Sequence, residues 1–444
     1  MVPASSSRAS VRLMRRIFRL RTLLVLAAFP LFGCGASSPT VTTTTGPNPP
    51  TPSYTVAGYY PEWGLYDSTP FVPKNLVSNG TAPLLTHLIY AFATINNNQC
   101  ALADTYADYQ DLLPASEAIS GVADTGPFAG NLHQLQELKA LYPNLQIMVS
   151  IGGGAMSPDV FSVAAEPANV NAFVTSCINL FIDGRFASGI TEPGIFTGID
   201  IDWEFPGQGT VNTPSTDQVN YTAMMQEFRS QLDAINPNYL LTTTAPAGSW
   251  AWQYMNFGAV QNSVNFLNVM NYDFDGPWST TTGFVAPLYQ SSSDPSNTNN
   301  AGYVVQSYLD MGVPKNKIVF GMPFYAYEWG AVTDQNDGLF EPCTADPSTG
   351  ECPNNTYEYN QLTTLTGYSP YRDAVTGEPW LWDGNSTFIT YDDPTSLGFK
   401  AQFVARQDLR GIMIWELSGD TTSGSLIQAL TSNLSSSAST TSKE

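Results

Sequence analysis

The chain contains only two histidines and five cysteines in 444 residues, and this scarcity excludes several kinds of active site. Neither His87 nor His133 has a second histidine or a cysteine at the spacing of metal ligands. A zinc site and a Ser/His/Asp relay are therefore poorly supported, and we expect no metal and no cofactor. If the chain is an enzyme, its proton transfers fall to carboxylates and tyrosines.

Basic residues are also few, with 17 Lys and Arg against 38 Asp and Glu and a formal charge of -21. Phosphate backbones are bound through Lys and Arg, so this balance excludes nucleic acid as an expected partner. The hydrophobic share of 43% is sufficient for a sizeable core, in one large domain or two ordinary ones.

The first 33 residues have the composition of an export signal. Six arginines within the first 21 residues precede an apolar run at 23–32, which is too short to span a membrane. The run ends in Leu31-Phe32-Gly33-Cys34, which resembles the lipobox of bacterial lipoproteins, where the cysteine is lipidated. Residues 34–53 are rich in Pro and Thr and predict an extended tether. We expect a secreted lipoprotein anchored through Cys34, on the bacterial cell surface or the periplasmic side; an ordinary secretory signal with a chance cysteine is the alternative.

From residue 54 onward, short apolar runs alternate with segments of helical periodicity, which is typical of βα units around a parallel sheet. Helices are expected at 131–142, 170–182 and 217–235, and strands at 54–60, 86–95, 145–153, 198–204, 240–246, 266–273, 317–325 and 411–417. Eight units over 54–434 predict an α/β fold, a closed (β/α)8 TIM barrel. An open doubly wound sheet is the alternative, but no G-x-G-x-x-G follows the first run.

The interval after the seventh run is too long for an ordinary connection. Residues 328–388 therefore predict an α+β subdomain inserted between strand 7 and the next barrel helix, which we expect near 393–406. Cys343 and Cys352 bracket a short polar loop in this insertion and are the favoured disulfide pair in an oxidising compartment. With Cys100 and Cys177, three pairings are possible. Residues 435–444 are expected to be a disordered tail.

The fourth apolar run contains a concentration of carboxyl groups. Side chains alternate along GIDIDWE at 198–204, so Asp200, Asp202 and Glu204 share one face while Trp203 lies on the other. In a barrel the acidic face points inward, with Glu204 at the carboxyl end where active sites form. Adjacent buried carboxyls raise the pKa of at least one of them, which suits a general acid. A solvated edge strand is the alternative interpretation of D-x-D-x-E.

Motifs on six expected strands together carry a specific resemblance. They are TGIDIDWE at 197–204, SIGG at 150–153, MNYD at 270–273, GYYPEW at 58–63, YAFA at 90–93 and Trp415. Over residues 54–432 the chain resembles the family 18 glycoside hydrolases, the chitinases and their relatives, with signatures DGxDxDxE, S-x-G-G and M-x-Y-D. Two positions depart from the family: Thr197 replaces the first aspartate, and Tyr327 stands at or near the place where many relatives have arginine.

The resemblance implies substrate-assisted hydrolysis with retention, an exception to the two-carboxylate rule. Glu204 would be the general acid and base, while the N-acetyl carbonyl of the substrate attacks its own anomeric carbon and forms an oxazolinium ion. Asp202 would hold the acetamido N–H, Asp200 would tune Asp202 by sharing a proton, and Tyr272 would bind the acetamido oxygen. The other candidate substrate-binding residues are Tyr59, Phe92, Ser150, Trp203, Met270, Asp273, Trp278, Tyr325 and Trp415.

Some of these residues have a second interpretation. Ser150 is equally explained as a small residue packed beside Gly152 and Gly153, and the outward face of Trp203 indicates packing. Tryptophan rings suit the C–H faces of pyranose sugars, although core packing is the alternative for any one of them. Those at or just after the carboxyl ends of expected strands are Trp63, Trp250, Trp252, Trp278, Trp329 and Trp415.

The expected function is endo- or exo-acting hydrolysis of β-1,4-linked N-acetylglucosamine polymers, with the insertion forming one wall of the cleft. The expected partners are chitin or its oligosaccharides, bound by a monomer. One alternative is an endo-β-N-acetylglucosaminidase that acts on N-glycans, and another is a catalytically silent chitin-binding lectin on the same barrel. The presence of Glu204 counts against the lectin, because such proteins typically lose the acid.

Overall fold

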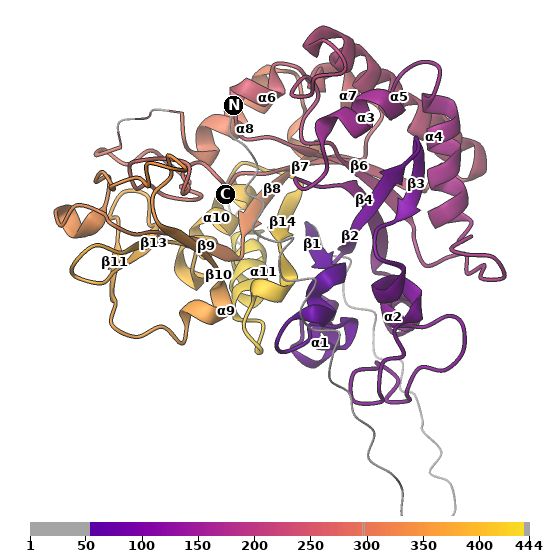
Figure 1. Ribbon diagram of the computed structural model, residues 1–444, viewed down its shortest axis with the longest axis horizontal. Helices are drawn as coiled ribbons and strands as arrows, with labels where there is room; N and C mark the ends of the chain where they lie inside the picture. The colour runs from indigo at the N-terminus through magenta and orange to yellow at the C-terminus, as the bar shows by residue number, and fades with distance from the viewer. Residues whose placement is uncertain (1–53, 295, 297, 439–444) are drawn as a thin grey trace, which may run out of the picture. The chain divides into compact units, whose positions relative to one another are not determined.

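Eight parallel strands close into a barrel in the computed structural model, which describes residues 54–294, 296 and 298–438 (Figure 1). Their order around the barrel is β1-β14-β8-β7-β6-β5-β4-β2, and β2 pairs with β1 to complete the circle. They are β1 (Thr55–Pro61), β2 (His87–Asn96), β4 (Gln146–Gly152), β5 (Gly198–Asp202), β6 (Leu240–Ala245), β7 (Phe266–Val269), β8 (Ile318–Pro323) and β14 (Gly411–Trp415). The expected (β/α)8 barrel is confirmed.

The barrel strands are buried along their length because both of their faces are covered. Every residue of β1, β5 and β8 is buried. The outward faces pack against the helices, and the inward faces form a separate cluster that includes Ile89, Met148 and Met413. Parallel pairing places Ser150, Asp200 and Thr242 of three adjacent strands at one level. Inward polar side chains at this level can therefore contact one another inside the barrel.

The helices surround the barrel on its outside (Figure 1). They are α1 (Pro73–Ser78), α2 (Gly130–Leu141), α3 (Pro158–Ala164), α4 (Val170–Cys177), α5 (Pro214–Ile235), α6 (Ser249–Trp252), α7 (Phe257–Val260), α8 (Ala301–Asp310), α10 (Pro394–Arg406) and α11 (Ser425–Ala438). The longest, α5, starts with Pro214 after a Thr213 hydroxyl that accepts a hydrogen bond from the Thr216 N–H. Its buried stripe includes Tyr221, Phe228 and Leu232, as its periodicity predicts.

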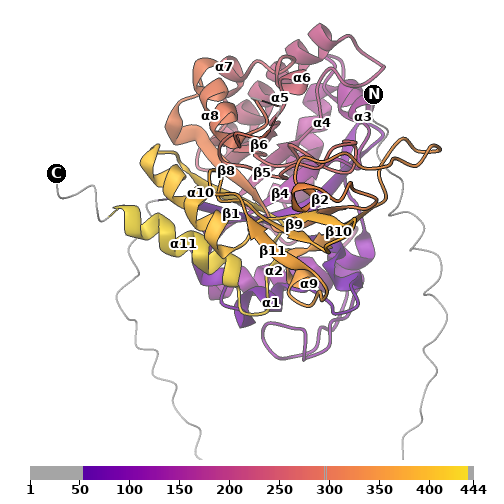
Figure 2. The same cartoon turned by 90° about the vertical axis from the view of Figure 1, so that its left-hand side faces the viewer.

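The structure describes most of the C-terminal end of the chain but not its N-terminal end. Helix α11 lies beside α10 and continues to Ala438, so the expected tail at 435–444 is wrong for its first four residues (Figure 2). The remainder of that tail lies outside the described residues, as do the expected signal, tether and Cys34 at 1–53. In the part of the chain that the structure describes, no helix has both the length and the apolar character needed to cross a membrane.

The expected insertion is a five-stranded antiparallel sheet in the order β10-β9-β13-β12-β11. Its strands are β9 (Tyr325–Trp329), β10 (Asn354–Glu358), β11 (Ser369–Arg372), β12 (Pro379–Trp382) and β13 (Phe388–Thr390), with the short helix α9 (Tyr359–Leu362). The sheet begins three residues before the expected boundary of 328, because β9 follows β8 after a single residue. It has its own core, which includes Trp329, Trp380 and Phe388.

Both disulfides are present in the structure. Cys343 pairs with Cys352 inside the insertion, as favoured from their spacing. Cys100 pairs with Cys177 and so ties β3 (Gln99–Leu102), a short antiparallel strand on the edge of β2, to α4.

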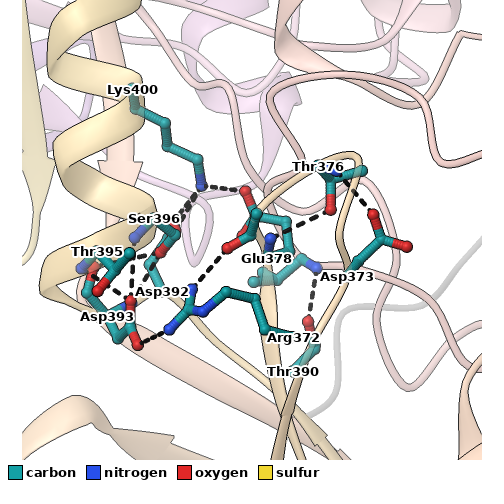
Figure 3. A network of polar contacts seen from close by, with 12 residues as sticks. Arg372, Asp373, Thr376, Glu378, Thr390, Asp392, Asp393, Thr395, Ser396 and Lys400 are labelled. Carbon is teal, nitrogen blue, oxygen red and sulfur yellow. Dashed lines mark hydrogen bonds and ion pairs between the residues drawn. The ribbon is translucent and has the colours of Figure 1, made fainter.

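A buried cluster of charges connects the insertion to the barrel (Figure 3). Lys400 of α10 is fully buried, and its Nζ lies 2.5 Å from Asp392 Oδ2 and 3.1 Å from Glu378 Oε1. Glu378 precedes β12 and Asp392 follows β13. The Lys400 ammonium therefore connects both ends of the β12–β13 hairpin to α10. Ser396 also donates a hydrogen bond of 2.6 Å to Asp392. Burial, followed by the charge of Asp392, raises the pKa of Glu378 well above its usual range.

Replacing Lys400 with Met is expected to lower the free energy of unfolding by about 3–5 kcal/mol, because Asp392 is left buried without its counter-ion. Urea denaturation followed by tryptophan fluorescence measures the change. Lys315→Met is the matched control at an exposed position and should change the free energy by less than about 0.5 kcal/mol. A Lys400→Met protein as stable as its parent would show that the cluster does not hold the insertion in place.

Candidate active site

The two acidic side chains of β5, Asp200 and Asp202, point into the barrel, as the alternation predicts. Asp200 and Asp202 are buried, with exposed fractions of 0% and 3%. Glu204 lies two residues beyond the end of β5 and is partly exposed at the carboxyl end of the barrel. A Cβ atom built on Gly154 would lie 3.4 Å from both carboxyl oxygens of Glu204, so the acid lies against the segment that follows β4. Two buried carboxyls therefore lead to a third that substrate can reach.

Asp200 is the hydrogen-bond centre of the barrel interior. Its Oδ2 accepts bonds of 2.8 Å from both the Tyr59 phenol and Ser150 Oγ. Its Oδ1 accepts from Thr242 Oγ1 at 2.5 Å and from Asn268 Nδ2 at 3.3 Å. Burial raises the pKa of Asp200, while these four donors act in the opposite direction and stabilise the carboxylate. Ser150 thus has a direct hydrogen-bonding role in addition to fitting beside its glycine neighbours.

Asp202 and Glu204 lie in surroundings that favour their protonated forms. Asp202 accepts a 2.5 Å hydrogen bond from Thr244 Oγ1 of β6. Burial, then the charges of Glu204 and Asp200, raise the pKa of Asp202 well above its usual range. Burial, then the charge of Asp273, raises the pKa of Glu204 to about 7. A carboxyl that keeps its proton near neutral pH and is open to solvent can act as a general acid.

The glycines at the end of β4, Gly152 and Gly153, permit the close approach of β4 to the acidic strand. Gly152 has φ +120°, and a Cβ on it would lie 2.0 Å from the carbonyl oxygen of Asp202. The N–H of Gly153 donates a 2.9 Å hydrogen bond to that same carbonyl oxygen. A larger residue at position 152 would therefore displace the backbone that carries Asp202.

Tyrosines and an aspartate line the side of the site formed by the end of β7 and by β9. Asp273, with φ +60°, follows β7, and the Tyr327 phenol donates a 2.9 Å hydrogen bond to its Oδ1. Tyr325 donates to the same oxygen. The Tyr272 ring is 7% exposed and meets the Tyr325 ring edge to face, with 6.1 Å between centroids. Because β9 belongs to the insertion, the insertion forms one wall of the site.

Aromatic rings cover the mouth of the barrel around Glu204. Trp415, at the end of β14, stacks on Phe92 with 5.6 Å between centroids, and Trp63 stacks on the same ring at 6.1 Å. Two tryptophans beyond this stack are more open, Trp278 at 42% exposed and Trp250 at 57%. Flat apolar surfaces of this kind suit the faces of sugar rings.

Two other tryptophans and a methionine from the predicted set are packed in the interior. Trp203 is 1% exposed and stacks on Phe161 in the core between barrel and helices, so its assignment to substrate binding is wrong and packing explains it. Trp329 is fully buried inside the insertion. Met270 is partly buried and packs against the barrel interior next to the site.

Sequence reasoning missed the groups that hold the aspartates. Thr242 and Thr244 of β6 and Asn268 of β7 donate to Asp200 or Asp202. The signal was present, because period-two alternation in LLTTTA puts Thr242 and Thr244 on one face. Of the two family departures, Thr197 lies at the opposite end of β5 from Glu204, where its hydroxyl donates to the Ile147 carbonyl at 3.2 Å. Tyr327 instead contacts Asp273 within the site.

The side chains that line the site can form hydrogen bonds and transfer protons. Its polar side chains carry carboxyl, hydroxyl and amide groups, as the contacts of Asp200, Asp202 and Asp273 show. Among residues 54–294, 296 and 298–438, no group of three or more His, Cys, Asp or Glu side chains is placed to hold a metal ion.

A family sequence model and individual relatives both match this chain over the barrel. The sequence model of the family described as glycosyl hydrolases family 18 matches residues 55–420. Chitinase C of Streptomyces lividans is 33% identical over 387 residues, which cover 85% of this chain and 59% of that protein. The chain therefore spans little more than half the length of that relative.

Solved structures resemble the chain over a similar extent. The catalytic domain of psychrophilic chitinase B from Arthrobacter TAD20 has a TM-score of 0.78 at 32% identity, over 86% of this chain and 96% of that one. The Group IV chitinase of Ostrinia furnacalis in complex with allosamidin has a TM-score of 0.73 at 25% identity, over 86% of this chain and 99% of that one.

Proposed function

The chain belongs to family 18 of the glycosyl hydrolases, and from that premise we propose that it is a chitinase that hydrolyses β-1,4 linkages between N-acetylglucosamine residues. One observation carries the proposal: Glu204, with its raised pKa, lies at the carboxyl end of β5 directly after two buried aspartates. The aromatic rings at the mouth of the barrel suit an uncharged polysaccharide, which a protein of net charge -21 does not repel. The relatives named as chitinases support this choice of substrate.

We propose a substrate-assisted reaction, in which Glu204 supplies the acid and the N-acetyl group of the substrate supplies the nucleophile, so that no nucleophile from the protein is needed. Glu204 gives its proton to the glycosidic oxygen as the bond to the anomeric carbon breaks. The carbonyl oxygen of the substrate's N-acetyl group forms a new bond to that carbon, which yields an oxazolinium ion. Water then attacks the anomeric carbon, the bond from that carbon to the acetamido oxygen breaks and restores the N-acetyl group, and Glu204 takes a proton from the water. The product retains the anomeric configuration.

The neighbouring groups orient the acetamido group in this proposal. Asp202 turns toward the substrate, accepts the acetamido N–H and stabilises the positive charge of the intermediate. The four hydrogen-bond donors to Asp200 stabilise its ionised form, whereas burial and the charges of Glu204 and Asp200 favour the protonated form of Asp202. The Tyr272 phenol donates to the acetamido oxygen.

Incubation with chitin oligosaccharides, followed by mass analysis and anomer assignment of the products, tests the function. Shortened oligomers with a β-anomeric reducing end are expected, and the pattern of lengths distinguishes endo from exo action. Cleavage of N-glycans in preference to chitin oligomers would identify an endo-β-N-acetylglucosaminidase. Binding without any cleavage would identify a lectin and overturn the proposal.

The pH dependence of the reaction should follow the proton on Glu204. The first step needs this carboxyl protonated, and its pKa is raised to about 7. The value of kcat/KM should therefore be sustained below that pKa and fall about tenfold per pH unit well above it. Initial rates on a soluble chitooligosaccharide across about pH 5 to 9 measure the profile. Activity that stays constant to the alkaline end would contradict the assignment of Glu204 as the proton donor.

We also propose that the protein is a membrane-anchored lipoprotein. Support comes from the arginine-rich apolar segment that ends in Leu31-Phe32-Gly33-Cys34 and from the Pro/Thr-rich stretch that follows. Cys34→Ala should move the protein from the membrane fraction to the soluble fraction after cell disruption. A variant that remains with the membranes would remove this proposal and leave the enzymatic one untouched.

A further inference from the structure

Two aromatic rings lie beside the proton donor. Phe205 directly follows Glu204, and its ring meets the Trp250 ring at 81°, with 5.4 Å between centroids. Phe205 is partly buried and packs against the hydrophobic core, whereas Trp250 is 57% exposed. Because an edge-to-face contact covers at most one face of an indole, the Phe205–Trp250 pair presents an open apolar surface next to the acid.

Trp250 does not contribute to the packing of its own helix. Ala251 of α6 is fully buried, and the Trp252 ring meets the Tyr308 ring of α8 at 5.9 Å, so these residues anchor the helix. Trp250 lies outside the hydrophobic clusters of the described residues. A single exposed tryptophan is common on protein surfaces and by itself indicates no function. The informative observation is how this one is held.

Trp250 is fixed by contacts with two neighbouring segments. A Cβ atom on Gly248 would lie 2.2 Å from Trp250 Nε1, so a larger residue there would displace the indole. The backbone at Gly248 is extended, with φ -104°, and does not itself require glycine. The Trp250 carbonyl accepts hydrogen bonds of 3.2 Å from Gln208 Nε2 and 3.1 Å from Gln253 Nε2. Because Gln208 belongs to the loop that follows Glu204, that loop is tied to α6.

The position of the pair relative to Glu204 indicates which part of a substrate it meets. In the proposed reaction Asp202 and Tyr272 hold the acetamido group, and they are only 3% and 7% exposed. Glu204 is partly exposed and gives its proton to the oxygen that joins this sugar to the leaving group. The leaving group therefore lies on the solvent side of Glu204, away from Asp202, which is the side where Phe205 and Trp250 follow.

The order of the barrel strands separates this pair from the other aromatic rings. The stack of Trp63, Phe92 and Trp415 comes from the ends of β1, β2 and β14, which are neighbours on one arc of the barrel. Phe205 follows β5 and Trp250 follows β6, which are neighbours on the opposite arc. A polymer that crosses the barrel mouth over the acid therefore meets the stack on one side and the Phe205–Trp250 pair on the other.

We propose that the Phe205–Trp250 pair binds the sugar chain of the leaving group, with a pyranose ring stacked on Trp250. The inference rests on the proposed function and assigns one part of the substrate to this surface. Because only the leaving group reaches the pair, its contribution is confined to substrates whose leaving group is itself a sugar chain.

Trp250→Ala tests the proposal with two substrates that differ in their leaving groups. Chitohexaose has sugar units on both sides of the cleaved bond, whereas para-nitrophenyl chitobioside releases a single nitrophenol. The quantity to measure is kcat/KM for chitohexaose divided by kcat/KM for the chromogenic substrate. We expect this ratio to fall about threefold to tenfold, the range of one aromatic contact. Trp250→Phe keeps a flat ring and should recover part of the ratio.

Tyr303→Ala is the matched control. Tyr303 is 43% exposed and lies on α8, one of the helices outside the barrel, so the same kind of exposed ring is removed away from the mouth. Its ratio should equal that of the parent. Thermal melting of both alanine variants verifies that they fold.

A purely structural role of Trp250 has a different signature. If the indole only braced Phe205 and the loop after Glu204, its loss would displace the acid and lower kcat/KM for both substrates by the same factor. An unchanged ratio would therefore overturn the inference, and so would a larger loss on the chromogenic substrate. A parent protein that cleaves neither substrate would overturn the proposed function instead, so the two failures are distinguishable.

Discussion

Glu204→Gln is expected to lower kcat by about 10²- to 10⁴-fold, the range that a positioned general acid contributes. The amide has the shape of the carboxyl but no proton to deliver at neutral pH. The side chain contacts the segment at Gly154 at the accessible end of the barrel, so the substitution leaves the packing of β5 unchanged. Steady-state kinetics on chitin oligosaccharides gives kcat, and calorimetric titration with the same oligosaccharides should give an affinity close to that of the parent.

Glu166→Gln is the matched control for this substitution. Glu166 follows α3 and Ala165 and is not among the residues of the site, so its replacement should leave kcat within about twofold. A Glu204→Gln enzyme that retains a substantial part of the parent activity would place the proton donor elsewhere and remove the observation on which the proposed function depends.

Asp202→Asn is expected to lower kcat by about 10²- to 10³-fold, comparable to the loss of one preorganised electrostatic group at a reaction centre. Asp202 is 3% exposed and lies between Asp200 and Glu204 on the inward face of β5. In the proposed reaction it accepts the acetamido N–H and stabilises the positive intermediate. An amide oxygen can still accept the N–H, but it carries no negative charge to stabilise the intermediate. Product formation in a single-turnover experiment measures the loss directly, because it excludes effects on product release.

Two further variants separate charge from position at Asp202. Thr244→Val removes the 2.5 Å hydrogen bond to Asp202 but keeps its charge, so the loss should be smaller than in Asp202→Asn. Asp334→Asn, at an exposed loop position, should leave turnover at the parent level. Turnover at the parent rate in Asp202→Asn would show that the intermediate does not depend on this carboxylate.

Local patterns in the sequence predicted much of the fold. Mostly apolar runs separated by helical segments predicted eight barrel strands, because a strand covered on both faces is buried along its length. Boundaries were less certain: the expected strand at 317–325 is divided into β8 and the start of β9, and the expected tail is helical to Ala438. A chain that continues from one sheet into another in an extended conformation carries no local signal of the change.

The alternation of side chains in β5 is a property of the extended backbone itself, and so the sequence by itself determined that Asp200, Asp202 and Glu204 share a face and that Trp203 lies on the other. Which groups meet those carboxyls was decided only by closure of the barrel, which brings Tyr59 to Asp200 across 141 residues and Tyr327 to Asp273 across 54. Such contacts depend on strand register and on the placement of an entire inserted sheet, both of which sum many weak packing terms over the chain. The raised pKa of Glu204 has the same origin, because burial and the nearby Asp273 exist only in the folded barrel.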